Sequence, residues 1–580
     1  MCEPPARSGE LIASGRMVVG ARRRFPVVLL RAAAWAVVAT GAACSLVVNQ
    51  SDSQCRATSD CLARGPAFAN TYCDDSQACV ASCTTNAQCT GTNTSDPWIC
   101  RADHVCAPLK SQDCATLLAD PNDTDAPVLS ANGEATSGEE SQVLWLGMLL
   151  PLDPTTAPLS QAKEDAANLA RNDFNTAGSL PPVVAGGPSR KLAFVVCDDT
   201  VDADRAAAHL VNDVHVPGII GPVYSDTLVT VATDVTDPAG VLLITPSATA
   251  TDISELPGKD DLIWRTCPSD ALQAQAMALV IEQTIAPEIA ETPIKIANVH
   301  KGDSYGEGLG SALESALVFN GATAAVNATN GDYIAFDYGD PSAASDTDPT
   351  KEYAAAVTEV LSFLPHVIAL VGTQEMITYI MQPIEAGWPS SAAYRPRYLL
   401  SDGAYPRPEL LQLVGTNADL RHRVLGTAPG TTSPAYTSFL SYYDSLVQDG
   451  TTPVLSTAAT YDAAYLFAYA TAAIGATPVT GANLVEGLKK IVVQGAPQVP
   501  IGPAGITRAL SLLTTPGEEE MKVVGTSGPL DYDTATGDPD GDIQVWCLSI
   551  DASGDATGFI NSGEYYDAEK QTLIPPVTCP

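Results

Sequence analysis

The stretch VLWLGMLLPL (143–152) decides the fold class of this protein. It is a continuous apolar run, not an alternating one, which is typical of a β-strand buried on both faces. Residues 161–172 then carry alanine and leucine at helical spacing, and a second apolar run, KLAFVVCDD (191–199), follows them. Buried strands that alternate with helices indicate parallel βαβ units, so the sequence predicts an open α/β sheet.

The alternation of apolar strands and helices continues far beyond these two strands. Further strands are predicted at 217–223, 239–249, 294–300, 366–372 and 396–403, and helices at 202–211, 226–236, 270–284, 306–319 and 351–363. So many units exceed one ordinary sheet, which usually has about four to six strands. We therefore expect two α/β lobes.

The order of these segments resembles that of the type I periplasmic binding proteins, in particular their leucine/isoleucine/valine-binding branch. The motifs that carry the resemblance span residues 143–550 and include LGMLLPL, AKEDAANLARNDFN, IIGPVYSD, VLLITPSATATDIS, DSYGEGLGSALESAL, VIALVGTQEM, LLSDGAY and GPLDYDTATGDPDGDIQVW. The resemblance implies two α/β lobes joined by three hinge crossings, with a ligand enclosed in the cleft between them.

The resemblance also sets expected boundaries for the lobes. Hinge crossings are expected near Cys267, Gly426 and Pro516. The binding domain would occupy residues 142–580, with lobe 1 at about 142–268 and 427–515 and lobe 2 at about 269–426 and 516–576.

Hydroxyl residues follow two of the predicted strands in lobe 1. Ser225 comes after the strand 217–223, and Ser247 and Thr249 come directly after Thr245-Pro246. In open α/β sheets the binding crevice lies at the carboxyl ends of the strands, where helix N-termini present free N–H groups. These hydroxyls can hold a carboxylate, and the resemblance assigns them to the α-carboxylate of a ligand. The alternative is that they cap the helices that follow.

Two residues of the other lobe complete the predicted site. Asp402 ends a strand where the resemblance places the acid that receives a ligand ammonium, and Tyr305 matches an aromatic side chain that closes over the ligand. The alternatives are a turn aspartate and a loop tyrosine. Thr373 and Gln374 stand where branched-chain members of the family usually carry aromatic residues, so the resemblance does not extend to the apolar side-chain pocket.

Residues 1–43 have the pattern of an export signal. Three arginines (22–24) precede an apolar run, 25–43, which is interrupted only by Arg31 and ends in small residues before Cys44. This pattern predicts a signal peptide, and so short a run with an internal arginine is poorly suited to span a bilayer. Cys44 resembles the lipidated cysteine of bacterial lipoproteins, which implies an N-terminal lipid anchor. Cleavage near Cys44 without lipidation is the alternative.

Eight cysteines follow in a tandem repeat of one unit, within a module predicted at 44–114. Their order is Cys55-x5-Cys61-x11-Cys73-x5-Cys79 and Cys83-x5-Cys89-x10-Cys100-x5-Cys106. Short cysteine-dense units in an exported chain indicate a disulfide scaffold, with pairing inside each unit as the simplest arrangement. Zinc is the alternative, although no CxxC knuckle is present. An acidic linker is predicted at 115–141, and Cys547 with Cys579 is a further candidate pair.

The composition restricts the function. The 580 residues include 30 Lys and Arg against 67 Asp and Glu, a formal net charge of −37, so the chain lacks the excess cations that nucleic-acid binding needs. HExxH, Walker A and GxGxxG motifs are absent, and we expect neither an enzyme nor a cofactor. The stretch 538–542 (DPDGD) lacks the glutamate that closes an EF-hand, so no metal site is predicted.

Together these patterns predict an exported protein of the periplasm or cell surface, anchored to a membrane by an N-terminal lipid. It would capture an amino acid or a similar small polar metabolite by hinge closure and deliver it to the permease of an ABC importer. The alternative is a surface receptor, sensor or adhesion lipoprotein that reuses the binding fold without transport.

Overall fold

The computed structural model describes most of the chain from residue 54 onward. The described residues are 54–56, 60–61, 63–65, 68, 71–73, 77–81, 97–101, 106–119, 142–153, 156–182, 187, 189–256, 261–340, 350–430, 434–448, 450–575 and 578–579. The predicted signal peptide and Cys44 lie outside this range, as does most of the predicted linker. The chain divides into two compact units, residues 1–80 and 81–580.

The first unit holds the first cysteine repeat. The short strands β1 (Thr71–Cys73) and β2 (Cys79–Ala81) form a two-stranded sheet. Disulfides join Cys55 to Cys73 and Cys61 to Cys79, which confirms pairing within this repeat. Because all four sulfur atoms are bonded, none is left as a thiolate for zinc, and the zinc alternative is wrong for this repeat.

The second repeat belongs to the larger unit and packs directly on lobe 1. Strands β3 (Trp98–Cys100) and β4 (Cys106–Pro108) form an antiparallel hairpin, and Ile99 and Leu109 are fully buried in a core that they share with lobe 1. A disulfide joins Cys114 to Cys197 of lobe 1. The predicted linker start at residue 115 is wrong, because β5 (Thr116–Leu118) is an edge strand of the lobe 1 sheet.

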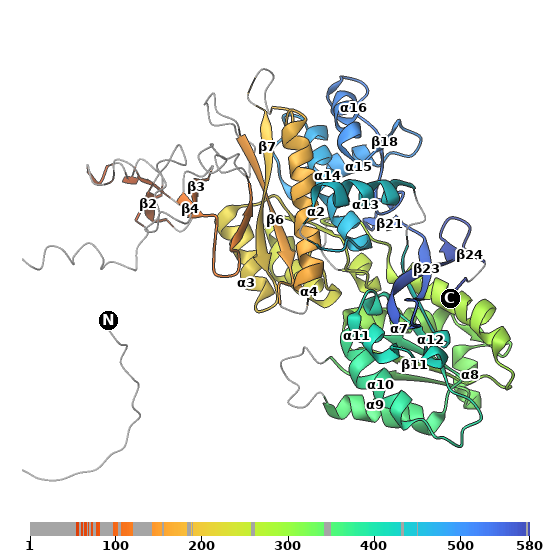
Figure 1. Ribbon diagram of the computed structural model, residues 1–580. Coiled ribbons are helices and arrows are strands. Elements are labelled where there is room, and N and C mark those ends of the chain that lie inside the picture. The colour runs from red at the N-terminus through yellow and green to blue at the C-terminus, as the bar shows by residue number, and fades with distance from the viewer. Residues whose placement is uncertain are drawn as a thin grey trace, which may run out of the picture. The chain divides into compact units, whose positions relative to one another are not determined.

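Lobe 1 is a six-stranded sheet in the order β10-β9-β8-β6-β7-β5, parallel except for β5 (Figure 1). Its remaining strands are β6 (Gln142–Leu150), β7 (Arg190–Asp198), β8 (Gly218–Ile220), β9 (Leu242–Thr245) and β10 (Ile263–Arg265). Helices α2 (Ala157–Thr176) and α14 (Leu455–Ala473) cover one face of this sheet, and α3 (Ala203–Ala208) and α4 (Ser225–Val231) cover the other.

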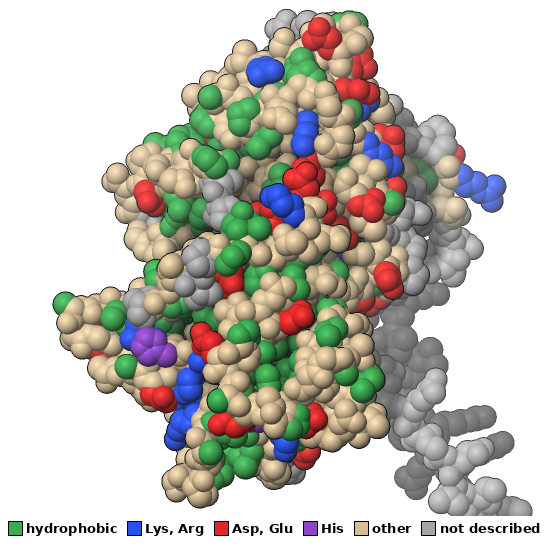
Figure 2. Space-filling model, turned by 90° about the vertical axis from the view of Figure 1, so that its right-hand side faces the viewer, with side chains coloured by type: hydrophobic (Ala, Val, Ile, Leu, Met, Phe, Trp, Pro, Cys, Tyr) green, Lys and Arg blue, Asp and Glu red, His purple; other side chains and the backbone are tan. Residues whose placement is uncertain are grey.

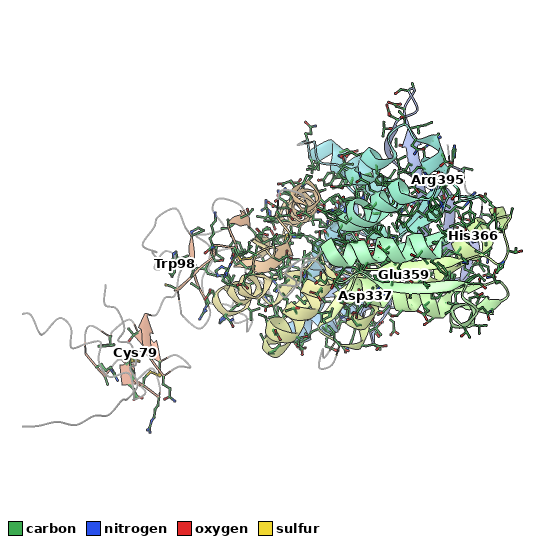
Figure 3. The ribbon with its side chains drawn as sticks, turned by 90° about the horizontal axis from the view of Figure 1, so that it is seen from below. Cys79, Trp98, Asp337, Glu359, His366 and Arg395 are labelled. Atoms are coloured by element: carbon green, nitrogen blue, oxygen red, sulfur yellow. A yellow bond between two sulfur atoms is a disulfide. The ribbon has the colours of Figure 1, made fainter. Side chains whose placement is uncertain are left out.

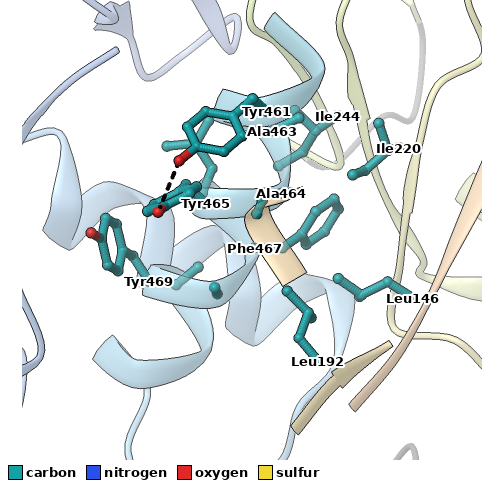
Figure 4. Close-up of a cluster of buried hydrophobic side chains, with 14 of the residues drawn as sticks. Leu146, Leu192, Ile220, Ile244, Tyr461, Ala463, Ala464, Tyr465, Phe467 and Tyr469 are labelled. Carbon is teal, nitrogen blue, oxygen red and sulfur yellow. Dashed lines mark hydrogen bonds between the residues drawn. The ribbon is translucent and has the colours of Figure 1, made fainter. Parts of the chain in front are cut away.

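The first predicted strand is buried on both faces, as expected. Leu144, Leu146 and Met148 of β6 face the core under α2 and α14, whereas Val143 and Trp145 face the opposite core. Figure 4 shows the close packing of the first core, in which Phe467 of α14 lies among Leu146, Leu192, Ile220 and Ile244 from four neighbouring strands. A Cβ atom at Gly218 would approach the Phe467 ring to 2.2 Å, so the glycine permits this contact.

Lobe 2 is an eight-stranded mixed sheet in the order β14-β11-β15-β16-β17-β22-β23-β24. Its strands are β11 (Ile296–His300), β14 (Tyr333–Asp337), β15 (Val367–Val371), β16 (Arg397–Leu400), β17 (Val424–Pro429), β22 (Ile543–Ile550), β23 (Ala556–Asp567) and β24 (Thr572–Ile574). The first five are parallel and the last three are antiparallel. The predicted Cys547–Cys579 disulfide is present at this antiparallel end.

The helices of lobe 2 and the smaller elements complete the fold. Helices α6 (Asp270–Leu279) and α7 (Ser304–Ala316) pack on one face of the lobe 2 sheet, and α9 (Thr350–Phe363) and α10 (Gln382–Gly387) pack on the other. The remaining elements are η4 (His209–Val214), η5 (Ala232–Thr236), α5 (Asp237–Ala239), η6 (Thr251–Glu255), η7 (Val280–Ile285), η8 (Ala286–Glu288), β12 (Val318–Phe319), β13 (Ala322–Thr323), α8 (Ala324–Asn330), η9 (Met376–Met381), η10 (Asp402–Ala404), α11 (Pro408–Val414), α12 (Ala418–His422), α13 (Pro434–Leu446), α15 (Gly481–Ile491), β18 (Gln498–Pro500), α16 (Pro503–Thr514), β19 (Lys522–Val524), β20 (Asp531–Asp533) and β21 (Asp538–Asp540).

The chain passes between the lobes three times. The first crossing follows β10, close to Cys267, and the second follows β17, a few residues after Gly426. The expected third crossing near Pro516 is wrong, and the chain crosses only between β21 and β22. The reason is that β19 pairs with β18 and that Met521, Val523 and Leu530 are buried in the lobe 1 core. Among the described helices, none is both long and apolar enough to cross a membrane.

Candidate ligand-binding cleft

A cleft of about 370 Å³ is lined by loops of both lobes. Lobe 1 contributes residues that follow the carboxyl ends of β6, β7, β8 and β9, and lobe 2 contributes residues that follow β11, β15 and β16. This is the edge at which open α/β sheets bind ligands. All five predicted site residues line the cleft, namely Ser225, Ser247, Thr249, Tyr305 and Asp402. The structure therefore brings together residues that are far apart in the sequence, since Ser225 and Asp402 are separated by 177 positions.

The lobe 1 wall presents hydroxyl groups on a loop with a fixed shape. The Thr245 hydroxyl accepts hydrogen bonds from the backbone N–H groups of Ser247 (3.3 Å) and Ala248 (3.0 Å). Ser225 is the first residue of α4, and its hydroxyl accepts a hydrogen bond from the N–H of Ala250 (3.2 Å). Ser225 therefore links two loops of the wall and does not cap its own helix, contrary to the capping alternative.

The lobe 2 wall presents a partly buried acid that is already hydrogen-bonded. Oδ1 of Asp402 lies 2.5 Å from the Tyr305 hydroxyl and accepts a hydrogen bond from Nε2 of Gln273 at 3.1 Å. The Tyr305 hydroxyl also lies 2.9 Å from the hydroxyl of Ser401. Burial raises the pKa of Asp402, although the hydrogen bonds from Tyr305 and Gln273 oppose this shift. An acid in this setting is stabilised by a cation brought to it.

A second acid, Asp270, is buried near Asp402 and was not predicted from the sequence. It is the first residue of α6 and is fully buried. The nearby side chain of Thr249 lowers the pKa of Asp270. However, neither carboxylate oxygen of Asp270 forms a hydrogen bond of normal geometry with another described residue. Burial raises the pKa of Asp270 well above its ordinary value, and the charge of Asp402 adds to the shift. The two acids make this end of the cleft a favourable place for a cation.

Two cations in the cleft were also missed, Lys163 on α2 and Arg407 at the start of α11. Both side chains are buried, with exposed fractions of 4% and 9%. Burial, together with the nearby charge of Arg407, lowers the pKa of Lys163 to about 8. Lysine within an amphipathic helix usually faces solvent, so the sequence pattern carried no signal for this position.

Of the other charged groups of the cleft wall, Lys301 is paired, whereas Asp199 has a buried carboxylate oxygen without a hydrogen-bond partner among the described residues. Lys301 forms an ion pair with Asp303 and a second with Asp340 at 3.4 Å. Asp199 lies at the end of β7, where burial raises its pKa to about 7. Acidic side chains are also scattered over the surface of both lobes, as Figure 2 shows for one face, in keeping with the strongly negative chain.

The stretch GDSYG (302–306) has the G-x-S-x-G spacing of a hydrolase nucleophile. Ser304 follows β11 and begins α7, but its hydroxyl donates to the carboxylate of Asp252 at 2.8 Å. Among the described residues no histidine is bonded to it, so the general base of a serine hydrolase is not in place. The bond instead joins lobe 2 to lobe 1.

Two further candidates from the sequence have structural roles. Asp538, in the calcium-like stretch, forms an ion pair with Arg265 at 2.7 Å and accepts a hydrogen bond from Ser254, which ties β21 to lobe 1. His366, labelled in Figure 3, directly precedes β15. Its Nδ1 accepts a hydrogen bond from the N–H of Lys295 (2.8 Å), and its ring stacks on Tyr394.

The family of the chain follows from a comparison with family models. A model described as periplasmic binding protein matches residues 144–516, which is more than half of the chain. The chain belongs to the type I periplasmic binding proteins. The match begins within β6 and ends before β19, so the cysteine repeats and the C-terminal strands of this periplasmic binding protein lie outside it.

Individual relatives match shorter parts of the sequence. The chain is 28% identical over 186 residues to the Leu/Ile/Val-binding protein BraC3 of Rhizobium johnstonii, a match that covers 32% of this chain and 46% of that protein. It is 31% identical over 179 residues to a leucine-, isoleucine-, valine-, threonine- and alanine-binding protein of Pseudomonas aeruginosa, covering 30% and 43%. The chain thus spans less than half the length of these curated relatives.

Solved structures show the same fold over most of the chain. A leucine binding protein from Thermotoga maritima aligns with a TM-score of 0.50 and 17% identity, covering 72% of this chain and 99% of that one. A solute binding protein of an ABC transporter from Rhodopseudomonas palustris, solved with 3,4-dihydroxybenzoic acid, aligns with a TM-score of 0.50 and 16% identity, covering 73% and 98%. At this identity the likeness shows the two-lobed fold alone.

Proposed function

We propose that this periplasmic binding protein captures an α-amino acid, or a similar small polar metabolite, by closing its two lobes. The observation that carries the proposal is that hydroxyl groups of lobe 1 and a partly buried acid of lobe 2 line one cleft. Ser225, Ser247 and Thr249 would bind the α-carboxylate, and Asp402 would bind the ammonium. A zwitterion has the two charges that these opposite walls require.

Closure of both lobes on the ligand accounts for the affinity that such a protein needs. Micromolar binding requires about 8 kcal/mol. Even excellent small ligands gain at most about 1.5 kcal/mol per non-hydrogen atom, so nearly every atom of an amino acid must be in contact with protein. A cleft with walls from two lobes provides that enclosure, and the closed form gives a transport partner a distinct surface to recognise.

We further propose that the captured ligand is delivered to an ABC importer and that Cys44 carries a lipid anchor outside the inner membrane. The importer is supported by the relatives named above, one of which is the solute binding protein of an ABC transporter. The anchor is supported by the sequence pattern before Cys44. Labelling with a radioactive fatty acid in cells tests it, and labelling that persists in Cys44→Ser would contradict the proposal.

A surface receptor is the second candidate function. The observation that favours it is the second cysteine repeat, which lies outside the family match, shares a buried core with lobe 1, and is followed by the Cys114–Cys197 disulfide and by an edge strand of that lobe. A binder that only feeds a permease needs no such addition. Uptake of the identified ligand by cells with and without the gene separates the two functions, because a receptor would leave uptake unchanged.

Ligand capture is tested by thermal unfolding of the intact exported protein in the presence of each proteinogenic amino acid. The intact chain is needed because a fragment that begins at residue 142 would lack β5 and Cys114. A ligand at 100 times its Kd adds about 2.7 kcal/mol to the free energy of unfolding, so a saturable rise in Tm is expected for at least one amino acid. Mass spectrometry of co-purified small molecules provides an independent check. The proposal fails if no amino acid raises Tm and none co-purifies.

A further inference from the structure

Lys163 is a buried cation without an acidic partner. It lies in the second turn of α2 and lines the cleft, and its side chain is 4% exposed. The Nζ atom reaches the carbonyl oxygen of Leu159 in its own helix at 3.4 Å, and no carboxylate of the described residues lies within ion-pair distance of it. A buried ammonium normally requires a counter-ion, because its desolvation is costly.

Arg407 is in the same situation on the other lobe. It precedes α11 and lines the same cleft, and its side chain is 9% exposed. Its Nε donates a hydrogen bond to the carbonyl oxygen of Gly403 at 3.2 Å, and it forms no ion pair with a described carboxylate. A guanidinium offers five N–H donors in a planar fork, so most of the donors of Arg407 remain available to a ligand.

Both cations line the same cleft, and they lie close enough for the positive charge of Arg407 to affect the pKa of Lys163. Arg407 is the charged residue whose effect on the pKa of Lys163 is resolved, and it lowers that pKa. Five acids line the cleft, namely Asp153, Asp199, Asp226, Asp303 and Asp402, and within the described chain none of them forms an ion pair with either cation. Asp303 pairs with Lys301, and Asp402 bonds to Tyr305 and Gln273. In a chain with 67 acids and 30 basic residues, two buried cations without an acid are unexpected unless an anion comes from outside the chain.

The charge of a bound amino acid is already satisfied by the groups assigned above. The hydroxyls of lobe 1 account for its α-carboxylate, and Asp402 accounts for its ammonium. An apolar side chain would leave both cations desolvated and without compensation. An oxyanion on the ligand side chain would instead accept hydrogen bonds from Nζ and from the guanidinium fork, and it would connect the two lobes, because α2 belongs to lobe 1 and α11 to lobe 2.

We propose that Lys163 and Arg407 form a subsite for an oxyanion on the ligand side chain, so that the ligand is an acidic amino acid. This inference rests on the proposed function, because it takes the other end of the ligand to be an α-amino acid. The replacement of the family's aromatic pocket residues by Thr373, which also lines the cleft, and Gln374 is consistent with a polar ligand side chain.

The subsite is tested by titration calorimetry of the intact protein with L-glutamate, L-aspartate, O-phospho-L-serine, L-glutamine, L-leucine and glutarate. At least one of the three acidic amino acids is expected to bind about tenfold or more tightly than glutamine and leucine. Lys163→Gln and Arg407→Gln are each expected to weaken that binding by about tenfold or more, and to leave the weak binding of glutamine unchanged. Arg508→Gln, which removes an exposed cation of α16 outside the cleft, is the matched control and should have no effect.

The outcomes separate this inference from the proposed function. If glutamine or leucine binds as tightly as every acidic ligand, or if both variants retain full affinity with an unchanged Tm of the unliganded protein, the subsite is wrong while amino acid capture stands. If only glutarate binds and Lys163→Gln weakens it, the oxyanion subsite stands and amino acid capture is wrong. If none of the compounds binds, both are wrong. Lys163→Met, which keeps the apolar stem, serves as a second variant if Lys163→Gln does not fold.

Discussion

The two lobes contribute different chemistry to one cleft. Lobe 1 presents hydroxyl groups, the acids Asp153, Asp199 and Asp226, and one buried cation, Lys163, whereas lobe 2 presents Asp402, Arg407 and the ion pair of Lys301 with Asp303. Their outer sides also differ. Lobe 1 is tied to the second cysteine repeat, and lobe 2 ends in an antiparallel extension closed by its own disulfide. Because the acid proposed to receive the ligand ammonium belongs to lobe 2, its substitution should have a larger effect on binding than the substitution of a single hydroxyl residue of lobe 1.

The largest effect is expected for Asp402→Asn in lobe 2. The substitution preserves the shape of the side chain but removes the negative charge that we propose receives the ligand ammonium. Loss of one partner of a buried charge pair costs about 3–5 kcal/mol, so binding of an amine-bearing ligand should weaken by about two to three and a half orders of magnitude. Calorimetry with the identified ligand measures this loss. Asp419→Asn, an exposed acid of the same lobe that pairs with Arg423, is the control. Equal affinity of the Asp402 variant and the wild type would remove Asp402 from the site.

The next largest effect concerns the covalent ties of the two lobes. Replacing both Cys114 and Cys197 with serine opens a link across 83 residues, and replacing both Cys547 and Cys579 opens a link across 32. Loop-closure entropy predicts losses of about 4.5 kcal/mol for the longer link and about 3.7 kcal/mol for the shorter, a difference of about 0.8 kcal/mol. Denaturant unfolding of the two double variants measures the difference. A larger loss of stability in the lobe 2 variant would show that loop length does not decide which disulfide is the more stabilising.

A pH effect is expected from the single cation of the lobe 1 wall. Burial and the charge of Arg407 lower the pKa of Lys163 to about 8, so the unliganded side chain loses its proton as pH rises through that value. If Lys163 binds an oxyanion, affinity for the acidic ligand should fall by about tenfold between pH 7 and pH 9. Calorimetry at both pH values should show this fall in the wild type and not in Lys163→Gln. A fall of equal size in the variant would assign it to another group.

The smallest effect is expected for Ser225→Ala in lobe 1. The hydroxyl is one of several neutral groups assigned to the α-carboxylate, and it also accepts a hydrogen bond from Ala250 N–H. Loss of a neutral hydrogen bond costs about 0.5–1.5 kcal/mol, so affinity should decrease by about tenfold or less. Measured beside Asp402→Asn, this variant tests the comparison directly. An effect as large as that of Asp402→Asn would mean that the lobe 1 wall contributes as much to ligand affinity as the lobe 2 wall.

The predicted site residues were found because they occupy positions that local sequence identifies. Ser225, Ser247, Thr249 and Asp402 follow apolar strands, and the carboxyl ends of parallel strands meet at one edge of a sheet. Lys163 and Arg407 carry no such signal, because one lies within a helix and the other in a connection before one. Whether such a side chain faces solvent or a cleft depends on which segment packs against it, and that segment lies more than 200 positions away.

The sequence by itself determined the strands and helices and the two-lobed family fold, and it predicted pairing within the first repeat and between Cys547 and Cys579 without fixing which cysteines of the repeat pair. These features follow from periodicity, spacing and the order of motifs, all of which are local along the chain. Only the tertiary structure decided that Cys114 pairs with Cys197, that the third crossing lies after β21, and that Asp270 is buried near Asp402. Each of these depends on packing between segments far apart in sequence, because burial and charge are set by spatial neighbours and not by adjacent residues.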